Sequence, residues 1–101
     1  MGIYPELESL VARGERVVLA TVVRTRGSTP REVGAQMLIK SDGSTIGTIG
    51  GGCGEADVWT EAMEALADGT PRLIDVDLLH DHDLEGGRAC GGIMSVFVEP
   101  V

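Results

Sequence analysis

Both cysteines of this chain stand beside runs of glycine, an arrangement that can bring a thiol close to a bound anion. The first run is Gly50–Glu55, which reads Gly-Gly-Gly-Cys-Gly-Glu, and the second is Cys90-Gly91-Gly92. Glycine tolerates positive φ and lets a ligand approach the main chain closely. The first run falls between a predicted strand and a predicted helix, whose N-terminus offers unpaired N–H groups and partial positive charge. We therefore interpret Gly51, Gly52 and Cys53 as part of an anion site that contains a thiol.

The two thiols have several interpretations. Cys53 is expected in the first turn of the helix, where the pKa of a thiol is lowered, although Glu55 adds opposing negative charge nearby. Cys90 follows Arg88 and faces Cys53 across a shared pocket if both loops reach the same edge of the sheet. Two alternatives stay open. Either cysteine can be a small buried apolar side chain, and a disulfide between them is a weaker alternative in a cytosolic protein.

A second candidate site segment reads Arg26-Gly27-Ser28-Thr29-Pro30-Arg31 and follows a predicted strand directly. Arginine forks suit phosphate or carboxylate oxygens, and hydroxyl groups add neutral donors. Arg26, Ser28 and Arg31 are therefore candidate anion contacts. The alternative is a tight turn in which the hydroxyl groups cap the backbone.

Several common chemistries are disfavoured by the sequence. The glycine run is not followed by Gly-Lys-Ser/Thr, and it lacks the Gly-x-Gly-x-x-Gly spacing of dinucleotide-binding folds. The chain has two histidines, His80 and His82, which alternate with aspartates and form a weak basis for a metal site. Ser28 has no evident histidine partner, so a catalytic triad is not predicted. We expect neither a metal site nor a catalytic residue.

The bulk composition is that of a small acidic globular protein. With 101 residues the chain is expected to form one domain with a modest core, and to gain stability as a homo-oligomer. The formal net charge of -8 argues against binding to nucleic acid or to an anionic membrane. No apolar run approaches the ~20 residues of a membrane span, and no signal-peptide pattern is present. We therefore expect a cytoplasmic protein with reduced thiols.

The elements that position these segments are predicted from apolar periodicity. A first amphipathic helix is expected over residues 3–11, with Pro5 in its first turn and Gly14 as its stop. Residues 17–23 are apolar and mostly β-branched, which is typical of a central strand buried on both faces. Residues 24–34 show no periodicity and are expected to form a loop.

A hairpin is predicted over residues 36–39 and 45–49, with its turn at Asp42-Gly43. The second helix follows the glycine run and ends at Gly69, with one buried face made of Trp59, Ala62, Met63 and Leu66. An edge strand, a long loop and a last strand follow, over residues 73–77, 78–92 and 93–98. This order predicts one α+β or α/β domain, in which two main helices pack against a mixed sheet of about five strands.

Three segments taken together resemble the XdhC/CoxI family, the xanthine dehydrogenase accessory factors. They are Gly27–Glu32 with Gly34-Ala35, Gly47–Cys53 with Glu55-Ala56, and Cys90-Gly91-Gly92. The similarity extends from about Arg16 to Glu99-Pro100, and the joint spacing of the three motifs is specific. It implies that residues 1–101 form an XdhC/CoxI-like domain.

The resemblance implies a maturation factor and not an enzyme. Family members bind the molybdenum cofactor, protect it during sulfuration and pass it to xanthine dehydrogenase or related molybdenum hydroxylases. A cysteine desulfurase is therefore an implied further partner. Soft thiolates suit molybdenum or its sulfido group, so Cys53 and Cys90 carry over as cofactor contacts beside Gly51 and Gly52. The residues that carry over as contacts to the phosphate of the pterin are Arg26, Ser28 and Arg31.

One departure from the family affects these expectations. Longer members add a C-terminal Rossmann-like domain, whereas this sequence stops after its last predicted strand, so a separate subunit is expected to supply that domain. Two alternative functions stay open. One is a small nucleotide-binding or thiol-redox enzyme that uses the same loops, and the other is an interaction subunit without a ligand of its own.

Overall fold

The computed structural model describes residues 3–27, 29, 32–49, 54–77 and 92–101. Two helices and five strands occur within them, which confirms the number of main elements predicted from the sequence. Their bounds along the chain are α1 Tyr4–Ala12, β1 Val17–Arg26, β2 Gln36–Lys40, β3 Thr45–Gly47, α2 Glu55–Asp68, β4 Arg72–Asp77 and β5 Ile93–Pro100. The helices stop just before the predicted glycines, Gly14 and Gly69.

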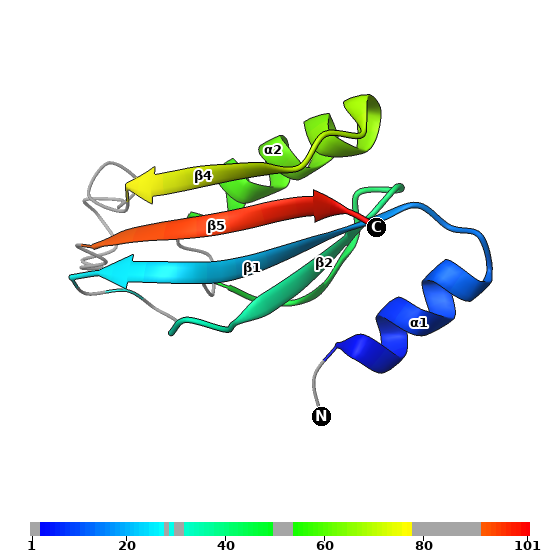
Figure 1. Ribbon diagram of the computed structural model, residues 1–101, viewed down its shortest axis with the longest axis horizontal. Coiled ribbons are helices and arrows are strands. Elements are labelled where there is room, and N and C mark those ends of the chain that lie inside the picture. The colour runs from blue at the N-terminus through cyan, green and yellow to red at the C-terminus, as the bar shows by residue number, and fades with distance from the viewer. Residues whose placement is uncertain (1–2, 28, 30–31, 50–53, 78–91) are drawn as a thin grey trace.

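The strands form one sheet in the order β3-β2-β1-β5-β4 (Figure 1). The sequence predicts a mixed sheet, but every pairing between neighbouring strands is antiparallel. The reason is topological: α2 connects β3 to β4 at opposite edges of the sheet and does not serve as a crossover between parallel neighbours. Of the two predicted classes, the fold is therefore α+β. β1 is the central strand, as its apolar, β-branched run predicts.

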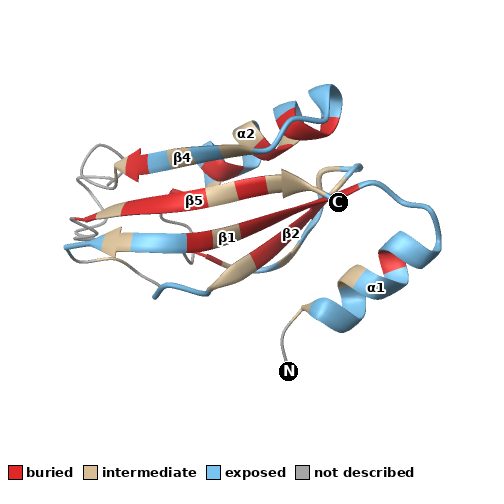
Figure 2. Cartoon of the chain, in the orientation of Figure 1, coloured by how far each residue is buried: buried red, intermediate tan, exposed pale blue. Residues whose placement is uncertain are grey.

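α2 packs on one face of the sheet and forms the main core with it, and the buried positions concentrate on β1, β5 and the inner side of α2 (Figure 2). Because side chains alternate between faces along a strand, every second residue of the long strands enters this core. The core residues of α2 are Val58, Ala62, Ala65 and Leu66, and those of the two central strands are Val18, Ala20, Val22, Met94, Val96 and Val98. α1 covers part of the opposite face through a smaller cluster of Leu10, Val17, Leu19 and Leu38.

Trp59 does not lie on the buried face of α2, so that part of the sequence prediction is wrong. Trp59 is 40% exposed, and the preceding residue, Val58, is fully buried in its place. The indole N–H donates a 2.9 Å hydrogen bond to the carbonyl of Gly43 in the turn between β2 and β3. Trp59 therefore connects α2 to the hairpin turn, which gives a large side chain a contact outside the core.

β4 is connected to α2 through Arg72. Its guanidinium group lies 2.6 Å from a carboxylate oxygen of Asp68 and 3.4–3.5 Å from those of Glu64 and Glu61. The backbone N–H of Thr70 and the guanidinium of Arg72 both stabilise ionised Asp68, and they lower its pKa below the ordinary value. These contacts fix the first residue of β4 beside the last turn of α2.

Within the described part of the chain, neither helix combines the length and the apolar content needed to cross a membrane.

Candidate functional site

The strands next to the predicted site segments end or begin at one end of the sheet. β1 ends at Arg26, which pairs with Ile93 at the start of β5. Ile93 pairs in turn with Asp77, the last residue of β4. The segment that follows Arg26 and the one that contains Cys90 therefore connect to the same end of the sheet (Figure 1).

The N-terminus of α2 is directed toward this same end of the sheet. The first turns of α2 contribute Asp57 to a pocket whose lining includes Val76, near the end of β4. The last turn of α2 contributes Asp68, which contacts Arg72 at the start of β4. α2 thus runs antiparallel to β4, and the glycine run that precedes α2 joins it at the end of the sheet where β4 finishes.

α2 begins at Glu55, with Gly54 as its N-cap residue. Gly54 is buried and has a left-handed conformation with φ of 75°, a combination that favours glycine. The first helical hydrogen bond runs from the N–H of Val58 to the carbonyl of Gly54. The sequence predicts Cys53 in the first turn of this helix; the described helix begins at Glu55, and Cys53 itself lies outside the described residues.

The side chain of Glu55 turns back from the helix onto the end of the preceding strand. Its Oε2 accepts the backbone N–H of Ile49 at 3.2 Å, and the hydroxyl of Thr48 donates to the same oxygen. Ile49 is fully buried in the main core, so these contacts fix the chain just before the glycine run to the helix just after it. We refer to the contacts among Thr48, Ile49 and Glu55 as the Glu55 clamp.

Sequence reasoning considered Glu55 as a charge opposed to the thiolate and as part of a family motif, and it missed the clamp. The contact joins residues six and seven positions apart across a strand end, so neither helical nor strand periodicity signals it. The one available signal is the preference for acidic side chains in the first turn of a helix, where they interact favourably with the helix dipole.

A bulge in β1 determines where the arginines of this strand point. The pairing of β1 with β5 shifts between Val22, which faces Val96, and Arg24, which faces Ser95, so Val23 is the extra residue. Such a bulge reverses the alternation of side chains beyond it. β1 continues to Arg26 because it pairs with β5 beyond the bulge, although the sequence predicts a loop from residue 24.

Arg26 therefore lies on the face of the sheet opposite to α2. Its partner Ile93 and the partner of Arg24, Ser95, alternate with Met94, which belongs to the core under α2. Directly paired residues of neighbouring strands share a face, so both arginines point away from α2. Arg26 is exposed at the end of the strand and approaches the proposed site from the side opposite to the helix N-terminus.

The other predicted site residues lie outside the described residues: Ser28, Arg31, Gly51, Gly52, Cys53 and Cys90, together with the two histidines His80 and His82. Within the part that the structure describes, no three His, Cys, Asp or Glu side chains form a group able to hold a metal ion. The described frame brings a helix N-terminus to the end of the sheet from one face and the arginines of β1 from the other. Both features favour an anionic ligand.

Comparisons with known proteins identify related sequences. Residues 10–77 match the XdhC and CoxI family. The Escherichia coli protein named uncharacterized protein YqeB is 42% identical over 98 residues, which cover 97% of this chain and 18% of that protein. A probable xanthine dehydrogenase subunit of Bacillus subtilis is 41% identical over 98 residues, covering 94% of this chain and 29% of the relative. The molybdenum cofactor insertion chaperone PaoD of Escherichia coli is 41% identical over 68 residues, covering 67% and 21%.

The fold also occurs in a solved structure. The crystal structure of a xanthine dehydrogenase from Bacillus halodurans superimposes with a TM-score of 0.83 at 35% sequence identity. The match covers 100% of this chain and 31% of that one. The chain therefore spans less than a third of the length of each of these four proteins.

Proposed function

The chain belongs to the XdhC and CoxI family, and we propose that it binds the molybdenum cofactor as cargo and delivers it to a molybdenum hydroxylase, without catalysing a reaction itself. Two of its relatives are named for xanthine dehydrogenase and for insertion of the molybdenum cofactor. The observation that carries the proposal is geometric. The end of β1, the N-terminus of α2 and the start of β5 are directed to one end of the sheet, although they are far apart in the sequence.

The cargo presents two kinds of group, and the proposed site offers a partner for each. The phosphate of the pterin suits backbone N–H groups of Gly51 and Gly52 ahead of α2. The molybdenum, or its sulfido group, suits the soft thiolates of Cys53 and Cys90. In this proposal the Glu55 clamp holds the helix and strand on either side of the glycine run in fixed positions.

The arginine segment forms the remaining part of the proposed site. Ser28 and Arg31 follow β1 in the sequence, and we propose that they contact the phosphate from the end of β1. Arg26 approaches from the face opposite to α2, so it is expected to contribute by charge attraction more than by a direct bond. Its substitution should therefore weaken binding of the cargo less than substitution of Cys53.

We propose a xanthine dehydrogenase-type molybdenum hydroxylase as the client. A cysteine desulfurase is a further proposed partner, because the family resemblance implies that the cofactor is sulfurated before delivery. We also propose that the chain acts in the cytoplasm as a homo-oligomer and as one XdhC/CoxI-like domain over residues 1–101, with a Rossmann-like subunit or domain as an additional partner.

The proposal is tested by retention of the pterin. The protein is purified from cells that make the molybdenum cofactor, the bound pterin is released and oxidised, and its fluorescence is compared among variants at equal protein concentration. We expect Cys53→Ala and Cys90→Ala to lose most of the signal and Arg26→Ala to lose part of it. Arg13→Ala is the matched control, because Arg13 is an exposed arginine after α1, outside the proposed site. It should retain the full signal.

Two outcomes would contradict the proposal. One is pterin fluorescence no higher than that of an unrelated protein purified in parallel. The other is retention by Cys53→Ala equal to that by Arg13→Ala. If a client hydroxylase binds in pull-down while no pterin is retained, the chain is an interaction subunit without its own ligand. Saturable binding of a nucleotide in place of the pterin would favour the enzyme alternative.

A further inference from the structure

β4 is an edge strand of the sheet that the described residues form. Among the described residues it pairs with β5 alone, along its whole length from Arg72 to Asp77. The outer edge of such a strand carries backbone N–H and C=O groups that can pair with a strand from another chain. The side chains around this edge determine which kind of strand can pair with it.

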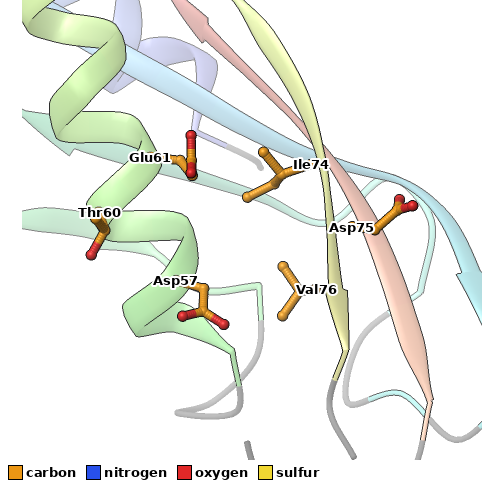
Figure 3. A pocket seen from close by; sticks show the side chains of 6 residues that line it. All are labelled: Asp57, Thr60, Glu61, Ile74, Asp75 and Val76. Atoms are coloured by element: carbon orange, nitrogen blue, oxygen red, sulfur yellow. The ribbon is translucent and has the colours of Figure 1, made fainter. Parts of the chain in front are cut away.

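A groove runs between β4 and α2 beside the open edge. Its volume is about 260 Å³, and side chains of both elements line it. Ile74 and Val76 project from β4 toward α2 and form an apolar floor, whereas Asp57 and Glu61 project from α2 at the rim (Figure 3). An apolar floor with carboxylates at its rim fits the aliphatic stem and the charged head of a lysine or arginine side chain.

The opposite face of the same edge is also acidic. Asp75 contributes to the lining of the groove, but its carboxylate is directed away from α2 (Figure 3) and accepts a 2.6 Å hydrogen bond from the hydroxyl of Ser95 on β5. By alternation along the strand, Asp77 lies on the same face as Asp75. The basic residue of β4, Arg72, is at the other end of the strand and contacts Asp68, Glu64 and, at 3.5 Å, Glu61, so the charge of Glu61 at the rim is partly compensated and that of Asp57 is not compensated by Arg72. A strand added to this edge would therefore meet negative charge on both of its faces near residues 75–77.

We propose that the open edge of β4 and its groove bind an extended basic segment of a partner protein, which adds to the sheet as a sixth strand. Backbone hydrogen bonds to β4 supply the pairing. Alternate lysine or arginine side chains of the segment lie in the groove, with their stems on the half-buried Ile74 and their heads near Asp57 and Glu61. This site uses no residue assigned to the molybdenum cofactor, so it does not rest on the proposed cargo.

The test uses a synthetic eight-residue peptide in which lysine and valine alternate, labelled with a fluorophore and titrated with the protein at low salt. We expect saturable binding by fluorescence anisotropy and slowed amide hydrogen exchange in β4. The double variant Asp57→Asn/Glu61→Gln should bind about tenfold more weakly, as expected for the loss of two partly exposed ion pairs. The matched control is Glu6→Gln/Glu8→Gln on α1, which changes the net charge equally and should alter the affinity less than about twofold.

A second peptide separates strand addition from general charge attraction. It has the same sequence with every backbone nitrogen methylated, so it keeps every charge but cannot donate backbone hydrogen bonds to an edge strand from either of its own edges. We expect its binding to be at least about tenfold weaker. Equal binding of both peptides, an equal effect of the two double variants, or no binding of the unmodified peptide at millimolar concentration would each overturn the proposal.

Discussion

Removal of the Glu55 carboxylate should destabilise the domain more than its partial exposure implies. In Glu55→Ala, the N–H of Ile49 loses its 3.2 Å acceptor and the hydroxyl of Thr48 loses the same oxygen. Hydrogen bonds to a charged group contribute about 1.5–3 kcal/mol each, and part of this is recovered when water reaches the freed groups. Loss of the acidic side chain from the first turn costs a further 0.3–1 kcal/mol, roughly, through the helix dipole.

The expected total for Glu55→Ala is about 2–4 kcal/mol, a large part of the roughly 5–15 kcal/mol that stabilises a typical domain. For a domain of this size, 3 kcal/mol lowers Tm by about 12–24 °C. Glu55→Gln keeps a neutral oxygen acceptor and should lose about 1 kcal/mol. Urea unfolding followed by the fluorescence of Trp59, the single tryptophan of the chain, measures these differences directly.

Asp57→Asn is the matched control for this prediction. Asp57 lies in the same first turn but is exposed, so its substitution removes only the dipole interaction, less than about 1 kcal/mol. Loss of no more stability in Glu55→Ala than in Asp57→Asn would refute the clamp. A change of slope with urea concentration in Glu55→Ala, beyond the change in midpoint, would show that the denatured or native state itself had altered.

Three further predictions concern the frame of the fold. Gly47→Ala should lower Tm markedly more than Gly69→Ala. Both glycines have positive φ, but a Cβ at residue 47 would lie 2.8 Å from the carbonyl oxygen of Gln36, whereas a Cβ at residue 69 would meet open space. Equal losses of Tm in the two variants would contradict this prediction. The pKa of Asp68 is lowered in the folded protein, so its ionised form stabilises the fold at pH above the ordinary pKa of 3.8, and this contribution is lost as the pH falls through the folded pKa. The Tm difference between wild type and Asp68→Asn should therefore be largest near neutral pH and vanish toward pH ~2. A Tm difference that does not change with pH would exclude the effect. Trp59→Phe removes the hydrogen-bond donor to the carbonyl of Gly43, and its free energy of unfolding in urea should fall by about 1 kcal/mol or less because the site is partly exposed. A fall of more than about 3 kcal/mol would show that this side chain behaves as a core residue.

The sequence predicts the elements of this fold well, because their signals are local. The apolar run from Val17 to Val23 marks the central strand, and Asp42-Gly43 marks the hairpin turn. The buried face of α2 is predicted for Ala62 and Leu66 but misplaced at Trp59. Periodicity identifies residues that share a face, but it does not reveal that a large side chain has a partner elsewhere, here the carbonyl of Gly43.

The bulge at Val23 is beyond such reasoning for a different reason. It arises because β5 pairs with β1 from far along the chain, and no residue near position 23 announces the shifted register. Its consequence is large, since a shift of one residue moves Arg24 and Arg26 to the opposite face of the sheet. Residue type and spacing can thus identify an arginine as a candidate site residue without showing which face of the sheet carries it.

The glycines before α2 fall into two groups: Gly54, and the three glycines that precede Cys53. Gly54 is explained by the fold, because it is buried and has positive φ at the N-cap of the helix. The fold also holds α2 through contacts that require no glycine: the Glu55 clamp at its start, and the hydrogen bond from the guanidinium of Arg16 to the carbonyl of Leu66 at its end. Glycine loses more conformational entropy on folding than any other residue, so three more glycines directly before Cys53 lower stability unless they serve another purpose. Close approach of a ligand to the main chain is such a purpose, and it predicts that Gly51→Ala reduces pterin retention while leaving Tm unchanged or raised, whereas Gly54→Ala lowers both.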